Sequence, residues 1–290
     1  MTDTTAEHLE FYGSSVVSCS LTVLRRHFPA LLFLAILNFA LSRGFAWLVD
    51  HLAAYVLAQG TPGGIWSYLS IIPTAFIDVL FAGIIAHRAW ADVAGEKTSL
   101  SQDVETVVPE CTALLGIEAA RFAVILAPAL PFILLFILSA TPIYPGLVAL
   151  RRLLEFALAI GGLAVLAGAI VASIAWSAAV PAAIVERLGV LAALRRSARL
   201  SFGFRAQIFG MLFLFGVCAV VPLFIVLRIA GLPANDPTGF STFAGAFTAL
   251  YRVAALMVYP VIYTVTYIAL LRIELGPGSP AEQMPQPCAP

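Results

Sequence analysis

Three long uncharged segments constrain this chain more than any other feature. No Asp, Glu, Lys, Arg or His interrupts residues 156–185, 206–227 or 253–271. A helix needs about 20 predominantly apolar residues to cross the roughly 30 Å hydrocarbon core of a bilayer. Only 11% of the residues are charged and 61% are hydrophobic, whereas a soluble domain is about 25% charged. The sequence therefore predicts an all-α integral membrane protein.

Three further apolar segments bring the expected number of transmembrane helices to six. Residues 28–49 and 65–91 are long enough to span, although Arg43 and Asp78 interrupt them, and residues 111–140 form the third span. An even number of spans places both termini on the same side of the membrane.

The expected organisation is one membrane domain with two short flanks. We expect a cytoplasmic segment with an interfacial helix over residues 1–27, six transmembrane helices within residues 28–272, and a short Pro-rich cytoplasmic tail over residues 273–290. Cytoplasmic loops of membrane proteins carry an excess of Lys and Arg. A cytoplasmic N-terminus puts eleven of the sixteen basic residues inside and five in or beyond the outer half, so the sequence predicts that both termini are cytoplasmic.

Short amphipathic helices are expected on the cytoplasmic surface at residues 14–27, 99–109 and 189–200. In the last of these segments one side gathers apolar residues and another gathers arginines at the helical period. Such a helix sinks its leucines into the acyl boundary and offers its guanidinium groups to lipid phosphates. The candidate headgroup ligands are Arg25, Arg26, Arg195, Arg196 and Arg199. The alternative is that these arginines only fix the topology; a nucleic-acid partner is not expected, because the basic segment is short and lacks interleaved aromatic residues.

Ionisable side chains inside a bilayer are costly and by default suggest function. Asp78 lies within the second span, at about the depth of Asn38 in the first, so we expect a hydrogen bond between them. The alternatives are a structural contact between helices and a proton- or substrate-linked role. Tyr259, Tyr263 and Tyr267 recur every four residues in the sixth span, where they line a groove or pack in the core.

Catalytic and metal-binding patterns are missing from the sequence. The four histidines lack metal-ligand spacing, and the four cysteines form no C-x-x-C pair. We therefore expect no catalytic residues, no metal and no cofactor, and the chain is not expected to be an enzyme.

Residues 178–214 carry a motif that resembles a known family. The segment AAVPAAIVERLGVLAALRRSARLSFGFRAQIFGMLFL resembles the signature of bacterial six-helix membrane proteins described as the membrane domain of glycerophosphodiester phosphodiesterase, together with their uncharacterised stand-alone relatives. The resemblance extends more loosely to residues 21–37, 92–108 and 263–276. The motif positions singled out are Pro181, Glu186, Gly189, Arg196 and Ser197.

The resemblance implies a place in the bacterial inner, or cytoplasmic, membrane. In fused members of the family the hydrolase is a separate soluble barrel, which we expect to be absent from this chain. The leading expectation is a non-enzymatic multi-pass inner-membrane protein that engages anionic lipid or organises a membrane partner, with a homo-oligomer as one such arrangement. The alternative is a small transporter or permease subunit with a polar path near Asp78.

Overall fold

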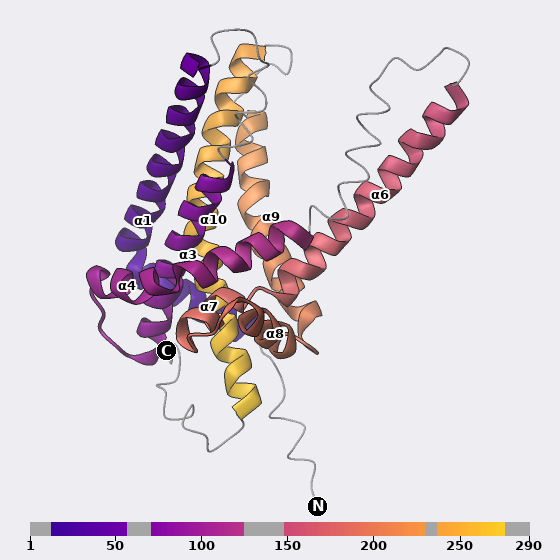
Figure 1. Ribbon diagram of the computed structural model, residues 1–290. Helices are drawn as coiled ribbons and strands as arrows, with labels where there is room; N and C mark the ends of the chain where they lie inside the picture. The colour runs from indigo at the N-terminus through magenta and orange to yellow at the C-terminus, as the bar shows by residue number, and fades with distance from the viewer. Residues whose placement is uncertain (1–12, 57–70, 125–147, 230–236, 276–290) are drawn as a thin grey trace, which may run out of the picture.

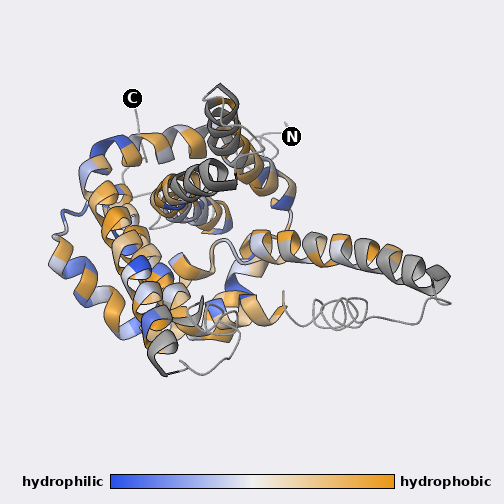
Figure 2. Cartoon of the chain, turned by 90° about the horizontal axis from the view of Figure 1, so that it is seen from above, coloured by the Kyte–Doolittle hydropathy of each residue, from blue (hydrophilic) through white to orange (hydrophobic). Residues whose placement is uncertain are grey.

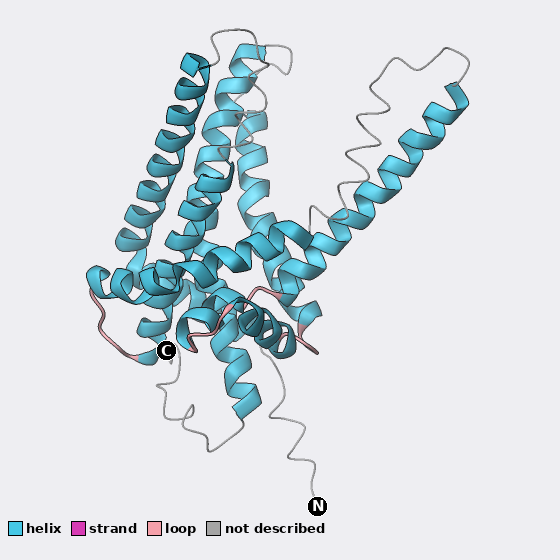
Figure 3. Ribbon diagram, in the orientation of Figure 1, coloured by secondary structure: helices cyan, strands magenta, loops and turns pink. Residues whose placement is uncertain are grey.

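The secondary structure is entirely helical in the described part of the chain. The computed structural model describes residues 13–56, 71–124, 148–229 and 237–275, and no strand occurs among them (Figures 1 and 3). The helices are α1 (Gly13–Val56), α3 (Ile71–Ala94), α4 (Leu100–Val107), the 3-10 helix η2 (Val108–Glu110), α6 (Val148–Ala175), α7 (Ala179–Val185), α8 (Val190–Leu200), α9 (Arg205–Ile229) and α10 (Pro237–Leu275). Residues 111–124 are also helical.

Among the described residues, three helices are long and apolar enough to cross a membrane. They cover Ser14–Val49, Thr74–Ala94 and Phe247–Leu275, and a fourth arises if Val190–Leu200 and Arg205–Cys218, which meet at a bend of 98°, form one span. These segments contain the first and sixth predicted spans and residues 74–91 of the second. The count of six stays a prediction, since much of the third predicted span falls outside the described residues.

The first helix differs from the sequence expectation. We predicted a separate interfacial helix over residues 14–27, but α1 runs without interruption from Gly13 to Val56 and includes Pro29. Its buried side chains form one stripe along the helix: Val16, Cys19, Ser20, Val23, Leu24, Leu31, Leu34, Ala35, Asn38 and Ser42. Because this stripe packs against the protein on both sides of Pro29, the first turns of α1 belong to the core.

The fourth apolar segment is broken in the structure. α6 ends at Ala175, a turn follows, and α7 then enters the core with six of its seven residues buried. A straight helix over all 30 residues of the segment would be about 45 Å long, well beyond the roughly 30 Å of a hydrocarbon core. The break ends α6 at Ala175 and places α7 among the short helices.

The molecule has two parts in Figure 1. α1, α3, α9 and α10 run roughly side by side as a bundle, and the short helices α4, α7 and α8 form a base at its lower end. The core lies where bundle and base meet, around Ile85, Leu114, Ile262 and Tyr267. α6 leans away from the bundle (Figure 1), and hydrophobic residues are frequent along most helices (Figure 2). Many large hydrophobic side chains are exposed, among them Phe33, Trp47 and Phe213.

Candidate functional site

An ion pair joins two long helices of the bundle. Asp78 of α3 accepts a hydrogen bond from Arg252 of α10, with 2.5 Å between Nη2 and Oδ2. The other carboxylate oxygen lies 3.4 Å from the Ser42 hydroxyl of α1. Arg252 is the partner that the sequence analysis missed, although a lone cation at the start of the last apolar segment is a signal that a carboxylate should lie nearby.

The predicted hydrogen bond between Asn38 and Asp78 is not formed. Asn38 is buried, with 1% of its surface exposed, and its Nδ2 has no hydrogen-bond partner among the described residues. Ser42, one helical turn further along α1, takes the predicted place beside Asp78. The depth estimate from the sequence was therefore wrong by about one turn, because it assumed equal entry depths for two separate helices.

A second ion pair faces the first from the helix of residues 111–124. Arg121 pairs with Glu118, three residues earlier on the same helix. The same guanidinium donates through Nη2 to the main-chain oxygen of Trp176, at 2.5 Å. Arg121 thereby ties its helix to the turn between α6 and α7.

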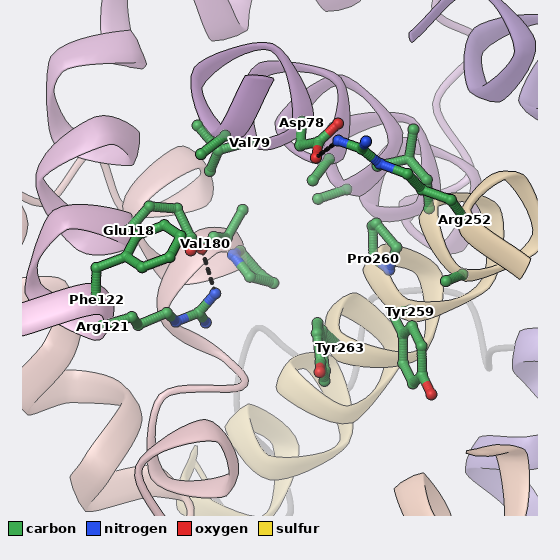
Figure 4. A pocket seen from close by; sticks show the side chains of 16 residues that line it. Asp78, Val79, Glu118, Arg121, Phe122, Val180, Arg252, Tyr259, Pro260 and Tyr263 are labelled. Carbon is green, nitrogen blue, oxygen red and sulfur yellow. Dashed lines mark hydrogen bonds and ion pairs between the residues drawn. The ribbon is translucent and has the colours of Figure 1, made fainter. Parts of the chain in front are cut away.

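A pocket of about 340 Å³ lies between these two ion pairs (Figure 4). Asp78 and Arg252 are on one side of the open space, and Glu118 and Arg121 are on the opposite side (Figure 4). Most of the remaining lining is apolar: Ala75, Val79, Ala82, Ala86, Phe122, Val180, Pro181, Ala255, Leu256 and Pro260. The pocket therefore combines a mainly apolar lining with ionic groups at two points, which is a lining typical of small-molecule sites.

The tyrosine stripe of α10 divides between this pocket and the core. Tyr259 and Tyr263 line the pocket and stack with their ring centroids 6.0 Å apart. Tyr267 is fully buried, 6.2 Å from the Trp90 ring by centroids, and donates its hydroxyl to Glu186 at 2.5 Å. Tyr259 and Tyr263 thus line a groove, whereas Tyr267 packs in the core.

Glu186 and Arg196, two of the motif residues, lie at the centre of an ionic network. Arg196 Nε is 3.0 Å from Glu186, and its Nη1 is 2.7 Å from Glu274 of α10. Arg199 also reaches Glu274, at 2.7 Å. The Arg196 side chain is only 17% exposed, and it joins the loop before α8 to the end of α10.

The remaining motif residues also have structural roles. The buried Ser197 hydroxyl donates to the carbonyl of Ala175 at 2.8 Å and accepts from the amide of Ala178 at 3.1 Å. It thereby satisfies backbone groups exposed by the break between α6 and α7. Gly189 is the N-terminal cap residue of α8, and Pro181 is buried beside the pocket.

The outward side of α8 carries both apolar and basic side chains. Leu191 is 67% exposed, and Phe202, just beyond the helix, is 73% exposed. Arg195 and Arg199 lie between them at steps of four and three residues along the same exposed face. Arg195 has no hydrogen-bond or ion-pair partner in the described part of the chain.

The buried side of α8 corrects the predicted arrangement of its leucines. Ala193, Leu194, Ser197 and Leu200 pack into the protein, so Leu194 does not face lipid. The apolar side of α8 is largely the inner one, and of Leu191 and Leu194 only Leu191 is exposed.

The two candidate arginines of α1 behave differently. Arg26 pairs with Asp92 of α3 at 3.1 Å, a carboxylate that His27 also approaches at 2.9 Å. Arg25 is exposed. The predicted headgroup role is therefore open for Arg25, whereas Arg26 contributes to joining α1 to α3.

A buried carboxylate in α4, which sequence reasoning did not single out, anchors that helix to α3. Asp103 is completely buried, with one oxygen 2.9 Å from His87 Nδ1 and the other 2.9 Å from Arg88 Nη1. Burial raises the pKa of the Asp103 carboxyl, but the hydrogen bonds from His87 and Thr98 and the charge of Arg88 outweigh it, so the pKa lies below its ordinary value of 3.8.

No group of three or more His, Cys, Asp or Glu in the described ranges could hold a metal ion. Comparison of the chain with family models, with curated proteins and with solved structures finds no match.

Proposed function

We propose that this chain is a non-enzymatic, multi-pass membrane protein that engages anionic lipid through the outward face of α8. The observation that carries the proposal is the exposed stripe of Leu191, Arg195, Arg199 and Phe202. Exposed apolar and basic side chains on one face are typical of helices that lie in a membrane interface. Six spans, cytoplasmic termini and a bacterial inner membrane complete the proposed setting, in line with the basic residues and the family resemblance.

Arg195 provides the sharpest test, because it contributes charge without a partner in the described structure. Each basic residue near an anionic leaflet contributes about 1 kcal/mol, or about a fivefold change in affinity. We expect phosphatidylglycerol to raise the melting temperature of the detergent-solubilised protein more than phosphatidylcholine does, and Arg195→Gln to reduce that preference.

The matched control is Arg43→Gln, an exposed arginine of α1 far along the chain from α8. It should leave the lipid preference unchanged. Arg196→Gln is unsuitable, because it would break the buried contacts with Glu186 and Glu274. Equal stabilisation of Arg195→Gln and the unmodified protein by phosphatidylglycerol would leave the arginines with a topological role only.

The transporter alternative gains support from the pocket. A polar path near Asp78 would start at the ion pair with Arg252, which lies beside a cavity. Lipid movement between leaflets of proteoliposomes, measured with Asp78→Asn against the unmodified chain, tests this alternative.

A further inference from the structure

The charges of the pocket sum to zero. Its four ionised side chains form two ion pairs, Asp78 with Arg252 and Glu118 with Arg121. In a low-dielectric setting each charge depends on its partner, and removing one leaves an uncompensated charge. A ligand that takes a guanidinium away from its carboxylate therefore has to provide that carboxylate with a cation.

The arginines of the two ion pairs differ in how many hydrogen-bond donors they have left for a ligand. Arg121 is held by a neighbour on its own helix and by the Trp176 carbonyl. Arg252 contacts a single acceptor among the described residues, Asp78, although a guanidinium has five N–H donors. The Arg252 and Asp78 side chains are 36% and 34% exposed, so both remain accessible.

The apolar part of the lining defines the rest of the ligand. Alanines and larger aliphatic residues of α3 and α10 separate the two ion pairs. A volume of about 340 Å³ is at the lower end of small-molecule sites, which are about 300 to 1,000 Å³. The pocket therefore has room for a polar headgroup and the beginning of a hydrocarbon chain.

We propose that this pocket binds the headgroup of a zwitterionic phospholipid, of the phosphatidylethanolamine type. The phosphate lies against Arg252 and the primary ammonium against Asp78, while the lipid chains leave along the apolar lining. Each charge of the ion pair gains an opposite charge and a charge-assisted hydrogen bond. An anionic headgroup would satisfy Arg252 but add a net negative charge beside Asp78.

This binding site is distinct from the α8 stripe, so the inference goes beyond the proposed function and does not depend on it. The test uses the full chain in detergent with phosphatidylethanolamine and phosphatidylglycerol of identical acyl chains, and native mass spectrometry measures which lipid is retained. In the Arg195→Gln variant, whose α8 stripe has lost a basic side chain, we expect phosphatidylethanolamine to be retained preferentially. Free phosphoethanolamine, which lacks chains, should not compete at equal concentration.

Asp78→Asn should shift the lipid preference from phosphatidylethanolamine towards phosphatidylglycerol. The asparagine keeps the shape of the side chain but leaves a net positive charge at Arg252, so retention of phosphatidylethanolamine should fall about tenfold or more relative to phosphatidylglycerol. The comparison is made in the Arg195→Gln background, so that phosphatidylglycerol held by the α8 stripe does not mask binding in the pocket. If Asp78→Asn leaves the ratio of retained phosphatidylethanolamine to phosphatidylglycerol unaltered in that background, the proposal is overturned.

A second variant protects the test against misfolding. Arg252→Lys keeps the positive charge and the ion pair but loses the planar guanidinium, so it should weaken phosphatidylethanolamine retention without reversing the preference. If Asp78→Asn fails to purify as a monodisperse protein, an unchanged lipid retention in Arg252→Lys would contradict a headgroup contact at Arg252.

Discussion

At the scale of single residues, two side chains of the motif hold the fold together. Arg196 lies between two glutamates, and Ser197 bridges the break between α6 and α7. A buried polar group needs its partners, since leaving a donor or acceptor unsatisfied costs about 1–3 kcal/mol. The spacing of the motif from Glu186 to Ser197 is therefore explained by packing, without any ligand.

Asp103 gives a pH-dependent prediction at the same scale. Its pKa is lowered in the folded protein, so it stabilises the fold above its ordinary pKa of 3.8, and this contribution is lost as the pH falls through the folded value. Asp103→Asn should lower the melting temperature at pH 7, and the difference from the unmodified chain should shrink below about pH 4. Thermal unfolding in detergent from pH 3 to pH 7 measures this.

Asp92→Asn is the matched control, because Asp92 also pairs with an arginine and a histidine, but next to the 58% exposed Arg26. Exposed ion pairs contribute little, typically about 0–1 kcal/mol. An equally large loss of stability in Asp92→Asn and Asp103→Asn would contradict the claim that Asp103 stabilises the fold more because it is buried.

At the scale of helices, the contact between the helix of residues 111–124 and α8 depends on a small residue where the two meet. Gly116, in the helix of residues 111–124, faces Val190 at the start of α8. A Cβ on Gly116 would lie 2.3 Å from Cγ2 of Val190. The first turn of α8 can approach this helix only because the position is a glycine.

Gly116→Ala should therefore destabilise the protein by about 1–3 kcal/mol, as expected for overpacking, although alanine favours a helix by about 1 kcal/mol. The matched control is Gly210→Ala in α9, where nothing lies within 4 Å of the added Cβ. That variant should be neutral or slightly stabilised. Equal melting temperatures for the two variants in detergent would show that Val190 moves aside at no cost.

At the scale of the whole molecule, the structure places the beginning of α1 and the end of α10 at the same end of the bundle, beside the base (Figure 1). An even number of membrane crossings would produce this arrangement, in agreement with the proposed topology. The native Cys19 is unsuitable for testing this topology by thiol labelling, because its side chain is buried.

Engineered cysteines test the topology directly. In a chain whose native cysteines are replaced by alanine, Arg195→Cys should react with an impermeant thiol reagent only after the cells are permeabilised. His51→Cys, exposed near the far end of α1, should react in intact cells. The reverse pattern would place the base and both termini outside the cytoplasm.

The sequence by itself determined the helical class and the positions of the long apolar segments. In an apolar solvent the backbone N–H and C=O groups have to be satisfied within the helix, and the thickness of the bilayer sets the length of each helix. The sequence also predicted an amphipathic helix at α8, because that property depends on helical period alone. The count of six spans rests on the same pattern and stays a prediction.

Only the tertiary structure decided which residues meet. Asp78 pairs with Arg252, 174 residues away, and Glu186 meets Tyr267 across 81 residues. No local pattern contains such pairings, because they depend on the depth and rotation of whole helices. The same limit explains why the sequence identified the two faces of α8 but not which of them packs into the protein: burial is a property of the neighbouring helices, and an apolar face has the same pattern whether protein or lipid covers it.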